Sequence, residues 1–207
     1  MINRAELKMR AKQMMSGNMG MLIVCYIIVA AITVVCNMIP VVGWVLAICV
    51  TGPLALGYCY IYLNLTRGME PDVNVLFSGF QRFVDTLVLT LLIGVFTFLW
   101  SLLLVVPGII KAISYSQAYY ILAEYPEMSG KEALDASIEM MDGHKMDYFV
   151  LMLSFIPWML LCTVTCGIAM LYVGPYMNAT FVNFYEAIKP PVVMNTGGDY
   201  ANTYYQA

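Results

Sequence analysis

Four long runs without a charged residue limit most strongly what this chain can fold into. They cover residues 13–66, 86–110, 112–123 and 148–185. A helix rises about 1.5 Å per residue, so about 20 apolar residues cross the hydrocarbon core of a bilayer. At that length the runs hold two spans, one span, a short partner span and two further spans. We therefore predict an all-α membrane protein with about six transmembrane helices, because lipid excludes strands with open edges.

The composition agrees with a lipid environment. Hydrophobic residues make up 61% of the 207 residues and charged residues 11%, whereas soluble domains have about 45–50% and about 25%. The N-terminus resembles a secretory signal, because a basic stretch precedes an apolar one. The apolar run continues far beyond the 7–15 residues or so of a signal peptide. An uncleaved first span is therefore expected.

The basic residues predict the orientation. With six spans, one side of the membrane holds both termini and nine of the ten basic residues, while the three short turns on the other side hold none. Basic loops stay in the cytoplasm, so both termini are expected there. The basic N-terminal arm also suits anionic lipid headgroups, although its role in orientation explains it equally well.

A threefold internal repeat is expected from the sequence. Met14-Met15-Ser16-Gly17 recurs in pattern as Leu76-Phe77-Ser78-Gly79 and as Met140-Met141-Asp142-Gly143, each time before an apolar run. The predicted unit is a cytoplasmic amphipathic helix, a glycine break and a transmembrane hairpin. Repeats are expected at about residues 3–66, 72–125 and 129–188 of one membrane domain, residues 1–189. Residues 190–207 are expected to form a disordered cytoplasmic tail.

The three amphipathic pieces differ in how clearly they can be predicted. Ser129 and Glu132 form a capping box before a helix with an apolar face that includes Leu134. Asn3 resembles a cap with Glu6, which also pairs with Arg10 in the favourable order. The second piece, residues 72–78, is barely two turns long.

Proline and glycine occur together within or beside the predicted spans. Pro107 with Gly108 fits a helix start, whereas Pro53, after Gly52, and Pro175 are expected to bend their spans. Pro157 is expected to do the same. Such breaks expose backbone to a substrate in transporters, but close packing of small residues between helices explains them as well. Gly143 is the break of the third repeat.

Two ionisable residues lie within or at the end of the fourth span. Lys111 is one turn past Pro107, so its side chain either snorkels to the outer headgroups or points into the bundle. Glu124 lies 13 residues further along, which places it near the opposite face of the membrane and rules out a pair with Lys111 on one helix.

No catalytic, metal or cofactor motif is found. The six cysteines are expected to pack as small apolar side chains, and Cys162 with Cys166 lacks a neighbouring histidine or carboxylate for a metal site. His144 is the only histidine, and HExxH, GxSxG, P-loop and GxGxxG patterns do not occur. We therefore expect no enzyme activity, no cofactor and no nucleic-acid partner.

A resemblance to a known family rests on short motifs in a fixed order. These motifs are Gly52-Pro53-Leu54, Gly57, Leu76-Phe77, Gly79-Phe80, Pro107-Gly108-Ile109-Ile110-Lys111, Tyr115, Tyr119, Ile121-Leu122-Ala123-Glu124, Glu132-Ala133-Leu134, Ser137, Gly143, Lys145, Ser154-Phe155-Ile156, Trp158, Pro175-Tyr176 and Phe184-Tyr185. In these residues the chain resembles the bacterial integral membrane proteins grouped as domain-of-unknown-function family 975 (DUF975), from about Arg4 to Lys189. The resemblance implies a multi-span protein of the bacterial plasma membrane with no established activity. Here the second cytoplasmic loop is short, and the tail lies outside the shared pattern.

Two functions from different classes remain open. The first is a non-enzymatic membrane component that contacts lipid, another membrane protein or a second copy of the chain. The second is a transporter or permeation path for a small solute. The candidate functional or packing residues are Lys111, Glu124, Pro107, Gly108, Gly52, Pro53, Pro175 and Gly143.

Overall fold

A computed structural model of the chain describes residues 4–38, 42–103, 105–165 and 167–189. Within these ranges the structure is helical and has no strand, which confirms the all-α prediction. The elements in chain order are α1 (Arg4–Met15), α2 (Met19–Asn37), α3 (Val42–Thr66), α4 (Val73–Ser78), the 3₁₀ helix η1 (Gly79–Arg82), α5 (Phe83–Leu103), α6 (Val105–Tyr115), α7 (Ala118–Glu124), α8 (Gly130–Met140), α9 (Lys145–Leu153), α10 (Ile156–Val164) and α11 (Met170–Ile188). The predicted tail lies outside the described residues.

The predicted capping box starts α8. The backbone N–H of Ser129 donates to Glu132 Oε2 at 2.8 Å, and the Glu132 N–H donates to Ser129 Oγ at 3.4 Å. Backbone N–H groups at the start of a helix have no acceptor within the helix, and these two contacts supply acceptors for them. Leu134 and Met141 are buried and Ile138 is half-buried, so the predicted apolar face of this helix is its packed face.

Helices α4 and α1 are also stabilised by contacts between residues close in the chain. The Asp72 carboxylate accepts a hydrogen bond from the Asn74 N–H at 2.9 Å and caps α4. Arg10 Nη2 donates to Glu6 Oε1 at 2.6 Å within α1, as predicted from their spacing. The predicted cap at Asn3 lies outside the described residues.

The predicted glycine breaks differ among the three positions. Gly17 and Gly143 have φ of 98° and 80°, a conformation that glycine adopts without steric cost, and each lies between two helices. The prediction is wrong for Gly79, which has φ of −59° and begins η1. A side chain at Gly79 would meet the Pro53 carbonyl oxygen, 2.0 Å from the Cβ position. Glycine is therefore needed there for close contact between η1 and α3.

The prolines lie at two kinds of position. Pro53 and Pro175 are inside α3 and α11, as predicted. Pro107 is in the first turn of α6, where its missing N–H leaves no bond unmade. Pro157 lies in the first turn of α10, directly after the turn that separates α10 from α9. It therefore starts a helix at the interruption of the apolar segment 145–164.

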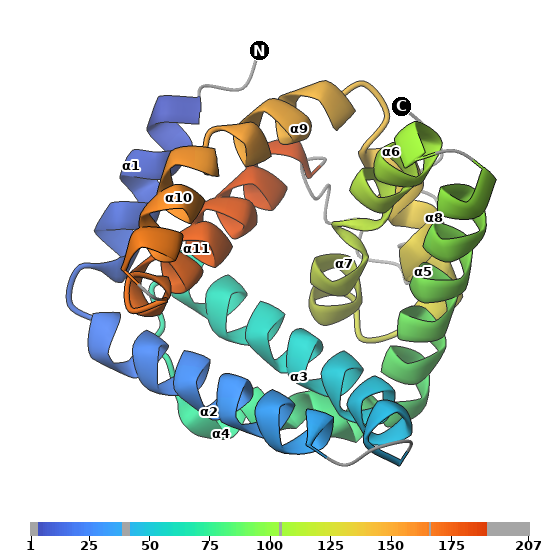
Figure 1. Cartoon of the computed structure of the whole chain (residues 1–207), viewed down its shortest axis with the longest axis horizontal. Coiled ribbons are helices and arrows are strands. Elements are labelled where there is room, and N and C mark those ends of the chain that lie inside the picture. Colours follow the sequence, from blue (N-terminus) through green and yellow to red (C-terminus); the bar gives the residue numbers. More distant parts are fainter. Residues whose placement is uncertain (1–3, 39–41, 104, 166, 190–207) are drawn as a thin grey trace, which may run out of the picture.

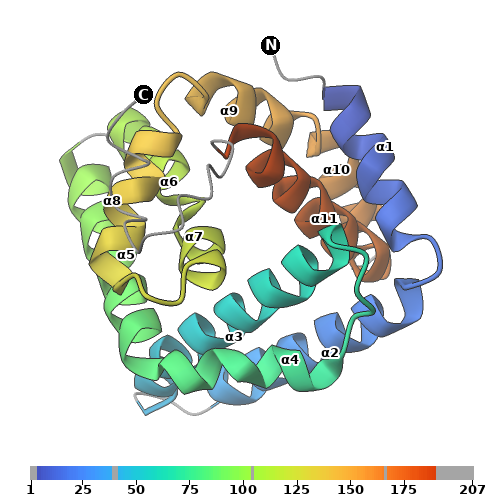
Figure 2. The ribbon, with the colours of Figure 1, turned by 180° about the vertical axis from the view of Figure 1, so that it is seen from behind.

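Each of the three amphipathic helices packs against other helices of the bundle. Helix α1 packs against α11, α4 packs against α3, and α8 packs against α5 and α7. Figures 1 and 2 show the helices arranged around a centre, with α1 from the start of the chain beside α11 from its end. The first and the last helix of the described chain therefore pack against each other.

The long helices form two sets that differ in burial. Only 11% of the residues are buried in Met19–Cys36 of α2, 11% in Val73–Leu102, which ends in α5, and 22% in Lys145–Val164 of α9 and α10, whereas 56% are buried in Ile48–Thr66 of α3. Helix α7 and most of α11 are buried as well. We call α2, α5, α9 and α10 the outer helices, and α3, α7 and α11 the inner helices. In Figure 1 α7 lies near the centre, and α2 and α5 lie at the periphery.

Four segments of the described chain are long and apolar enough to cross a membrane, which fits a membrane-embedded protein. They are Met19–Cys36, Ile48–Thr66, Val73–Leu102 and Lys145–Val164. The other two predicted spans are not among them. Residues 105–124 form two short helices, α6 and α7, and α11 carries Asn178, Thr180 and Asn183. An inner helix tolerates such polar residues because protein rather than lipid surrounds it.

Candidate functional site

A buried carboxylate joins the ends of the three inner helices. Glu124 is the last residue of α7, and its side chain is only 10% exposed. Its Oε1 accepts from Arg67 Nη2 and from Lys189 Nζ, both at 3.0 Å, and its Oε2 accepts from the Tyr185 hydroxyl at 2.5 Å. Arg67 follows α3, and Lys189 follows α11. We call Arg67, Glu124, Tyr185 and Lys189 the Glu124 cluster.

The surroundings of Glu124 favour its charged form. Burial alone would raise the pKa of Glu124, but hydrogen bonds from Tyr185 and Lys189 and the charges of Lys189 and Arg67 lower it below its ordinary value. For Lys189, burial would lower the pKa, but its bonds to Glu186 and Glu124 and their charges raise it. The cluster therefore holds an anion between two cations at neutral pH.

A second polar contact fixes the loop that follows Glu124. Arg82, from η1, donates to the Leu122 carbonyl at 2.7 Å and also to the Met128 carbonyl. Its Nη2 pairs with Asp85 at 3.0 Å, and the Arg82 side chain is only 15% exposed. The guanidinium donates hydrogen bonds to carbonyl groups at the end of α7 and in the loop before α8. These bonds hold the segment that contains Glu124 in place.

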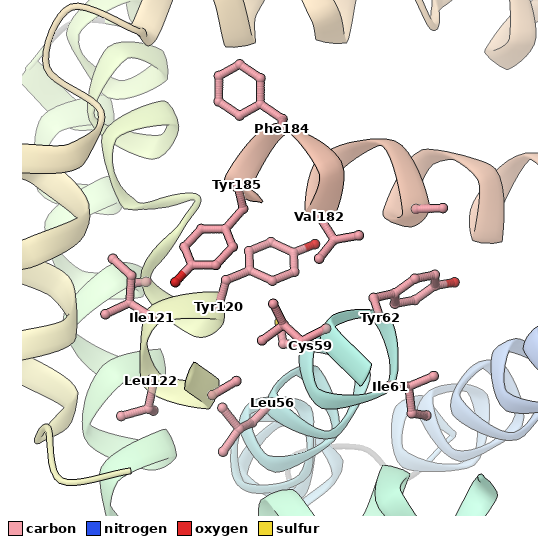
Figure 3. Packing of buried hydrophobic residues seen from close by; sticks show 14 of the residues in the cluster. Leu56, Cys59, Ile61, Tyr62, Tyr120, Ile121, Leu122, Val182, Phe184 and Tyr185 are labelled. Carbon is pink, nitrogen blue, oxygen red and sulfur yellow. The ribbon is translucent and has the colours of Figure 1, made fainter. Parts of the chain in front are cut away.

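Aromatic side chains separate the Glu124 cluster from a central pocket. Tyr120 of α7 stacks on Tyr185 of α11, with ring centroids 5.4 Å apart. Tyr120 also lines the pocket, whereas Tyr185 does not. Figure 3 shows the two rings side by side, with Cys59 and Tyr62 of α3 close to them. All three inner helices thus meet in this aromatic layer.

The central pocket has a volume of about 890 Å³ and lies between the inner helices and the outer helices α2 and α9. Its lining is mostly apolar and aromatic and contains no charged residue. The lining residues are Tyr26, Val29, Ala30, Thr33, Val34, Met38, Ala55, Tyr58, Cys59, Tyr62, Ser116, Tyr119, Tyr120, Tyr148, Asn178 and Phe181. A pocket of this size and character suits a small organic molecule.

A second pocket, of about 550 Å³, adjoins the first. It lies between α5 and α6, and its lining includes Gly94, Phe98 and Ala112. Ser116 and Tyr119 line both pockets. The Tyr119 hydroxyl is hydrogen-bonded to Thr90 Oγ1 at 2.7 Å, so this contact between α5 and α7 forms part of the boundary between the two pockets. We call this second pocket the α5–α6 groove.

Of the candidate residues from the sequence, Glu124 alone belongs to the cluster. The ammonium of Lys111 lies 5.2 Å from the ring centroid of Trp100 in α5, and Lys111 lines neither pocket. A helical side chain leans toward the N-terminus of its helix. Lys111 therefore leans toward the start of α6, where Pro107 and Gly108 lie, and away from Glu124.

The remaining candidates lie at helix contacts or in a turn. A side chain at Gly52 would meet Thr90 Oγ1, 2.5 Å from the Cβ position, and one at Gly108 would meet Ser101 Oγ at 2.4 Å. Pro53 packs against η1 through its carbonyl, and Pro175 is buried in α11. Gly143 forms the turn before α9. These positions match the packing interpretation of the small residues.

Sequence reasoning missed three members of the cluster and the pocket tyrosines. Arg67 and Lys189 served only as orientation signals, and Tyr185 served only as part of the family resemblance. A signal was present: Arg67, Glu124 and Lys189 lie at or near the ends of three successive tyrosine-bearing apolar segments. Charged residues at equivalent ends of repeated helices are candidates for mutual contact.

Metal binding finds no support in the described residues. No group of three or more histidine, cysteine, aspartate or glutamate side chains in these ranges is placed to hold a metal ion. Cys25, Cys36, Cys49, Cys59 and Cys162 are free thiols. The predicted neighbour of Cys162, at position 166, lies outside the described residues.

Comparison with known proteins identifies the family. The family model described as "Protein of unknown function (DUF975)" matches residues 1–114 and 102–191. The chain belongs to the DUF975 family. No curated protein and no solved structure matches the chain. Family membership confirms the resemblance found in the sequence but assigns no activity, so a function for this DUF975 protein has to be argued from its own residues.

Proposed function

We propose that this DUF975 protein is a non-enzymatic component of the bacterial plasma membrane that crosses the bilayer six times and interacts with lipid. The single observation that carries this proposal is the contrast between outer and inner helices. The outer helices expose large apolar side chains, such as Val95, Leu99 and Leu160 at 53%, 59% and 63%. Water would not stabilise that surface, whereas lipid does.

The contacts between helices support three hairpins as the repeating unit. Each hairpin has an outer first helix (α2, α5, or α9 with α10) and a second part that consists of an inner helix (α3 or α11) or ends in one (α6 followed by α7). Each amphipathic helix packs on the inner part of the preceding hairpin, in the pairs α1 with α11, α4 with α3 and α8 with α7. The inner parts end at Arg67, Glu124 and Lys189, which meet. This cyclic arrangement favours six spans with both termini on the cytoplasmic side, where the positive charge is.

Cysteine labelling in intact cells tests the placement. Single cysteines at positions 39, 111 and 131 of a cysteine-free variant are exposed to a membrane-impermeant maleimide. The proposal predicts labelling at 39 and, if the Lys111 side chain reaches the outer headgroups beside Trp100, at 111. Position 131, in the exposed first turn of α8, is predicted to react only after the cells are opened. Labelling of 131 in intact cells, or none at 39, contradicts the six-span model.

A transport role is the second candidate, favoured by the central pocket and by the Glu124 cluster beyond it. In that role the cluster and the Tyr120–Tyr185 layer would form the closed cytoplasmic barrier of a permeation path. Proteoliposomes that contain the chain should then swell faster in glycerol than empty liposomes, and Ala30→Trp, which fills the pocket, should abolish the difference. The same swelling measurement on Lys111→Met tests whether the lysine is needed for transport. Swelling equal to that of empty liposomes, with glycerol and with larger polyols, contradicts transport of neutral solutes.

A further inference from the structure

The chemistry of the central pocket selects against an ion. Its lining contains six tyrosines and no charged side chain. A charged group in such a pocket would lose its water without gaining a counter-charge, which is strongly unfavourable in a low-dielectric site. The Glu124 cluster does not supply one, because its carboxylate already binds two cations and the cluster lies outside the lining. A neutral ligand does not meet this penalty.

Two tyrosines in one wall of the pocket have unsatisfied hydroxyls. The hydroxyl oxygens of Tyr58 and Tyr62 are buried and have no hydrogen-bond partner among the described residues. Tyr62 is only 1% exposed, and its ring stacks on that of Tyr58 with centroids 5.8 Å apart. Buried hydroxyls are normally hydrogen-bonded. Both tyrosines line the pocket, so an oxygen atom of a bound ligand can provide the missing partner.

Two other polar side chains of the lining already have partners. Ser116 Oγ donates to the Ile113 carbonyl at 2.8 Å, and Asn178 Nδ2 donates to the Gly174 carbonyl at 3.0 Å. Among the described lining residues, the buried hydroxyls without a partner are those of Tyr58 and Tyr62, and apolar surface such as Val29 and Phe181 lies elsewhere in the pocket. That division suits a molecule with one small polar end and an aliphatic remainder.

The α5–α6 groove adjoins this pocket on the exposed side of α5. Phe98 in the groove is 65% exposed, and α5 is an outer helix. Ser116 and Tyr119 lie between groove and pocket, where the helix is interrupted between α6 and α7. A molecule dissolved in the bilayer reaches the groove without passing through water.

We propose that the central pocket binds one neutral amphiphile from the bilayer, a molecule with an aliphatic chain and an uncharged head that carries hydroxyl or ester oxygens, with that head at Tyr58 and Tyr62. This inference rests on the membrane placement proposed above. It adds the class of ligand, the residues that recognise it and the route by which it enters.

Binding of radiolabelled 1-monooleoylglycerol to the purified full-length protein in nanodiscs tests the proposal. Saturable binding is expected, and unlabelled monooleoylglycerol should compete for it much better than oleate, which is charged, or hexadecane, which lacks a head. The double variant Tyr58→Phe, Tyr62→Phe should bind about 2- to 10-fold more weakly, the range for loss of neutral hydrogen bonds. Ala30→Trp should abolish binding.

A matched control and a kinetic measurement complete the test. Tyr172→Phe removes a hydroxyl from an exposed tyrosine of α11 outside the pocket and should leave the Kd unchanged. Gly94→Phe fills the groove at a position where a Cβ meets nothing within 4 Å. It should slow association of ligand delivered in liposomes and leave the Kd unchanged. An unaltered rate overturns the route from the bilayer.

Three outcomes overturn the binding site itself. They are no saturable binding, equal competition by oleate, and unchanged affinity in both the tyrosine double variant and Ala30→Trp. The labelling experiment at positions 39, 111 and 131 does not depend on any ligand. A protein that shows the six-span labelling pattern and yet binds no monooleoylglycerol therefore contradicts the pocket proposal and leaves the membrane placement standing.

Discussion

The outer helix α5 and the inner helix α11 have similar lengths, 21 and 19 residues, and opposite designs. Helix α5 is strongly apolar and mostly exposed, with Val95, Phe98 and Leu99 on its surface. Helix α11 has buried Thr180 and Asn183, whose side chains donate to carbonyls one turn earlier, at 2.8 Å and 2.7 Å. Polar groups are thus inside and apolar groups outside, the reverse of the arrangement in a water-soluble bundle.

This difference shows which interactions hold each set of helices in place. Lipid is as apolar as the outer helices, so their association gains little from burial of apolar surface. The inner helices are joined instead by specific contacts: the Glu124 cluster, the aromatic layer and close backbone approaches such as Gly57 of α3 against Leu76 of α4. Substitutions at inner positions should therefore cost more than similar substitutions at outer positions.

The largest effect is expected from Glu124→Gln. This change leaves Arg67 without the anion it pairs with, and leaves Lys189, only 20% exposed, with Glu186 as its remaining partner at 2.8 Å. Removal of one partner from a buried ion pair costs about 3–5 kcal/mol, and partial exposure of Arg67 places our expectation near the lower end. Thermal unfolding of the purified protein measures it. Glu127→Gln, at an exposed position of the next loop, is the control and should have almost no effect.

A double-mutant cycle with Lys189→Gln separates the pair from its surroundings. If Glu124 and Lys189 interact as the 3.0 Å contact indicates, the double variant should be more stable than the sum of the single effects predicts. Additive effects would show that the two side chains do not interact.

The next largest effect is expected from Gly57→Ala. Its Cβ would lie 1.9 Å from the Leu76 carbonyl oxygen, so α3 and α4 would have to separate, at a cost of about 1–3 kcal/mol. Gly94→Ala in the outer helix α5 meets nothing within 4 Å and should stabilise the protein by up to about 1 kcal/mol, since alanine favours a helix. Equal effects at the two positions would contradict the distinction between inner and outer helices.

Tyr185→Phe should have a smaller effect. The tyrosine is fully buried and donates to Glu124 at 2.5 Å, so loss of this bond to a charged acceptor should cost about 1.5–2 kcal/mol. Tyr172→Phe in the same helix is the matched control, because Tyr172 is partly exposed. Chemical unfolding of the two variants in one detergent compares them directly.

The pH dependence of stability gives a fourth prediction. Since the pKa of Glu124 is lowered in the folded protein, its contribution is complete above its ordinary pKa of 4.5 and is lost as the pH falls through the lower folded value. Since the pKa of Lys189 is raised, its contribution is complete below 10.5 and is lost as the pH rises through the higher folded value. The stability gap between wild type and Glu124→Gln should be constant near neutral pH and close in acid. A gap that widens in acid would contradict this.

The smallest effect is expected from Lys111→Met. Lys111 contacts the face of Trp100 at 5.2 Å, and a cation–π contact at a partly exposed site contributes about 0.5–1 kcal/mol. The change should therefore destabilise the protein far less than Lys189→Met, which removes a cluster member. A loss equal to that of Lys189→Met would place Lys111 in a buried polar network.

Local features were predictable from the sequence, and contacts over long separations were not. The capping box at Ser129 and Glu132 and the prolines inside α3 and α11 depend on neighbours close in the chain. Glu124 was a candidate, but its partners Arg67 and Lys189 are 57 and 65 residues away. The repeat makes equivalent helix ends candidates for contact, but the sequence alone does not specify which side chains at those ends meet. The role of Gly79 was predicted wrongly for a related reason, because this glycine is required by close contact with Pro53 in another helix.

Quenching by brominated lipid tests the central claim, that polar contacts join the inner helices while the outer helices face lipid. Two single-tryptophan variants of an otherwise tryptophan-free protein, Phe96→Trp in α5 and Phe184→Trp in α11, are reconstituted in brominated phosphatidylcholine. Phe96 is 39% exposed and Phe184 is 1% exposed. The structure predicts strong quenching at position 96 and little at position 184. Similar quenching at both positions would contradict the division into outer and inner helices.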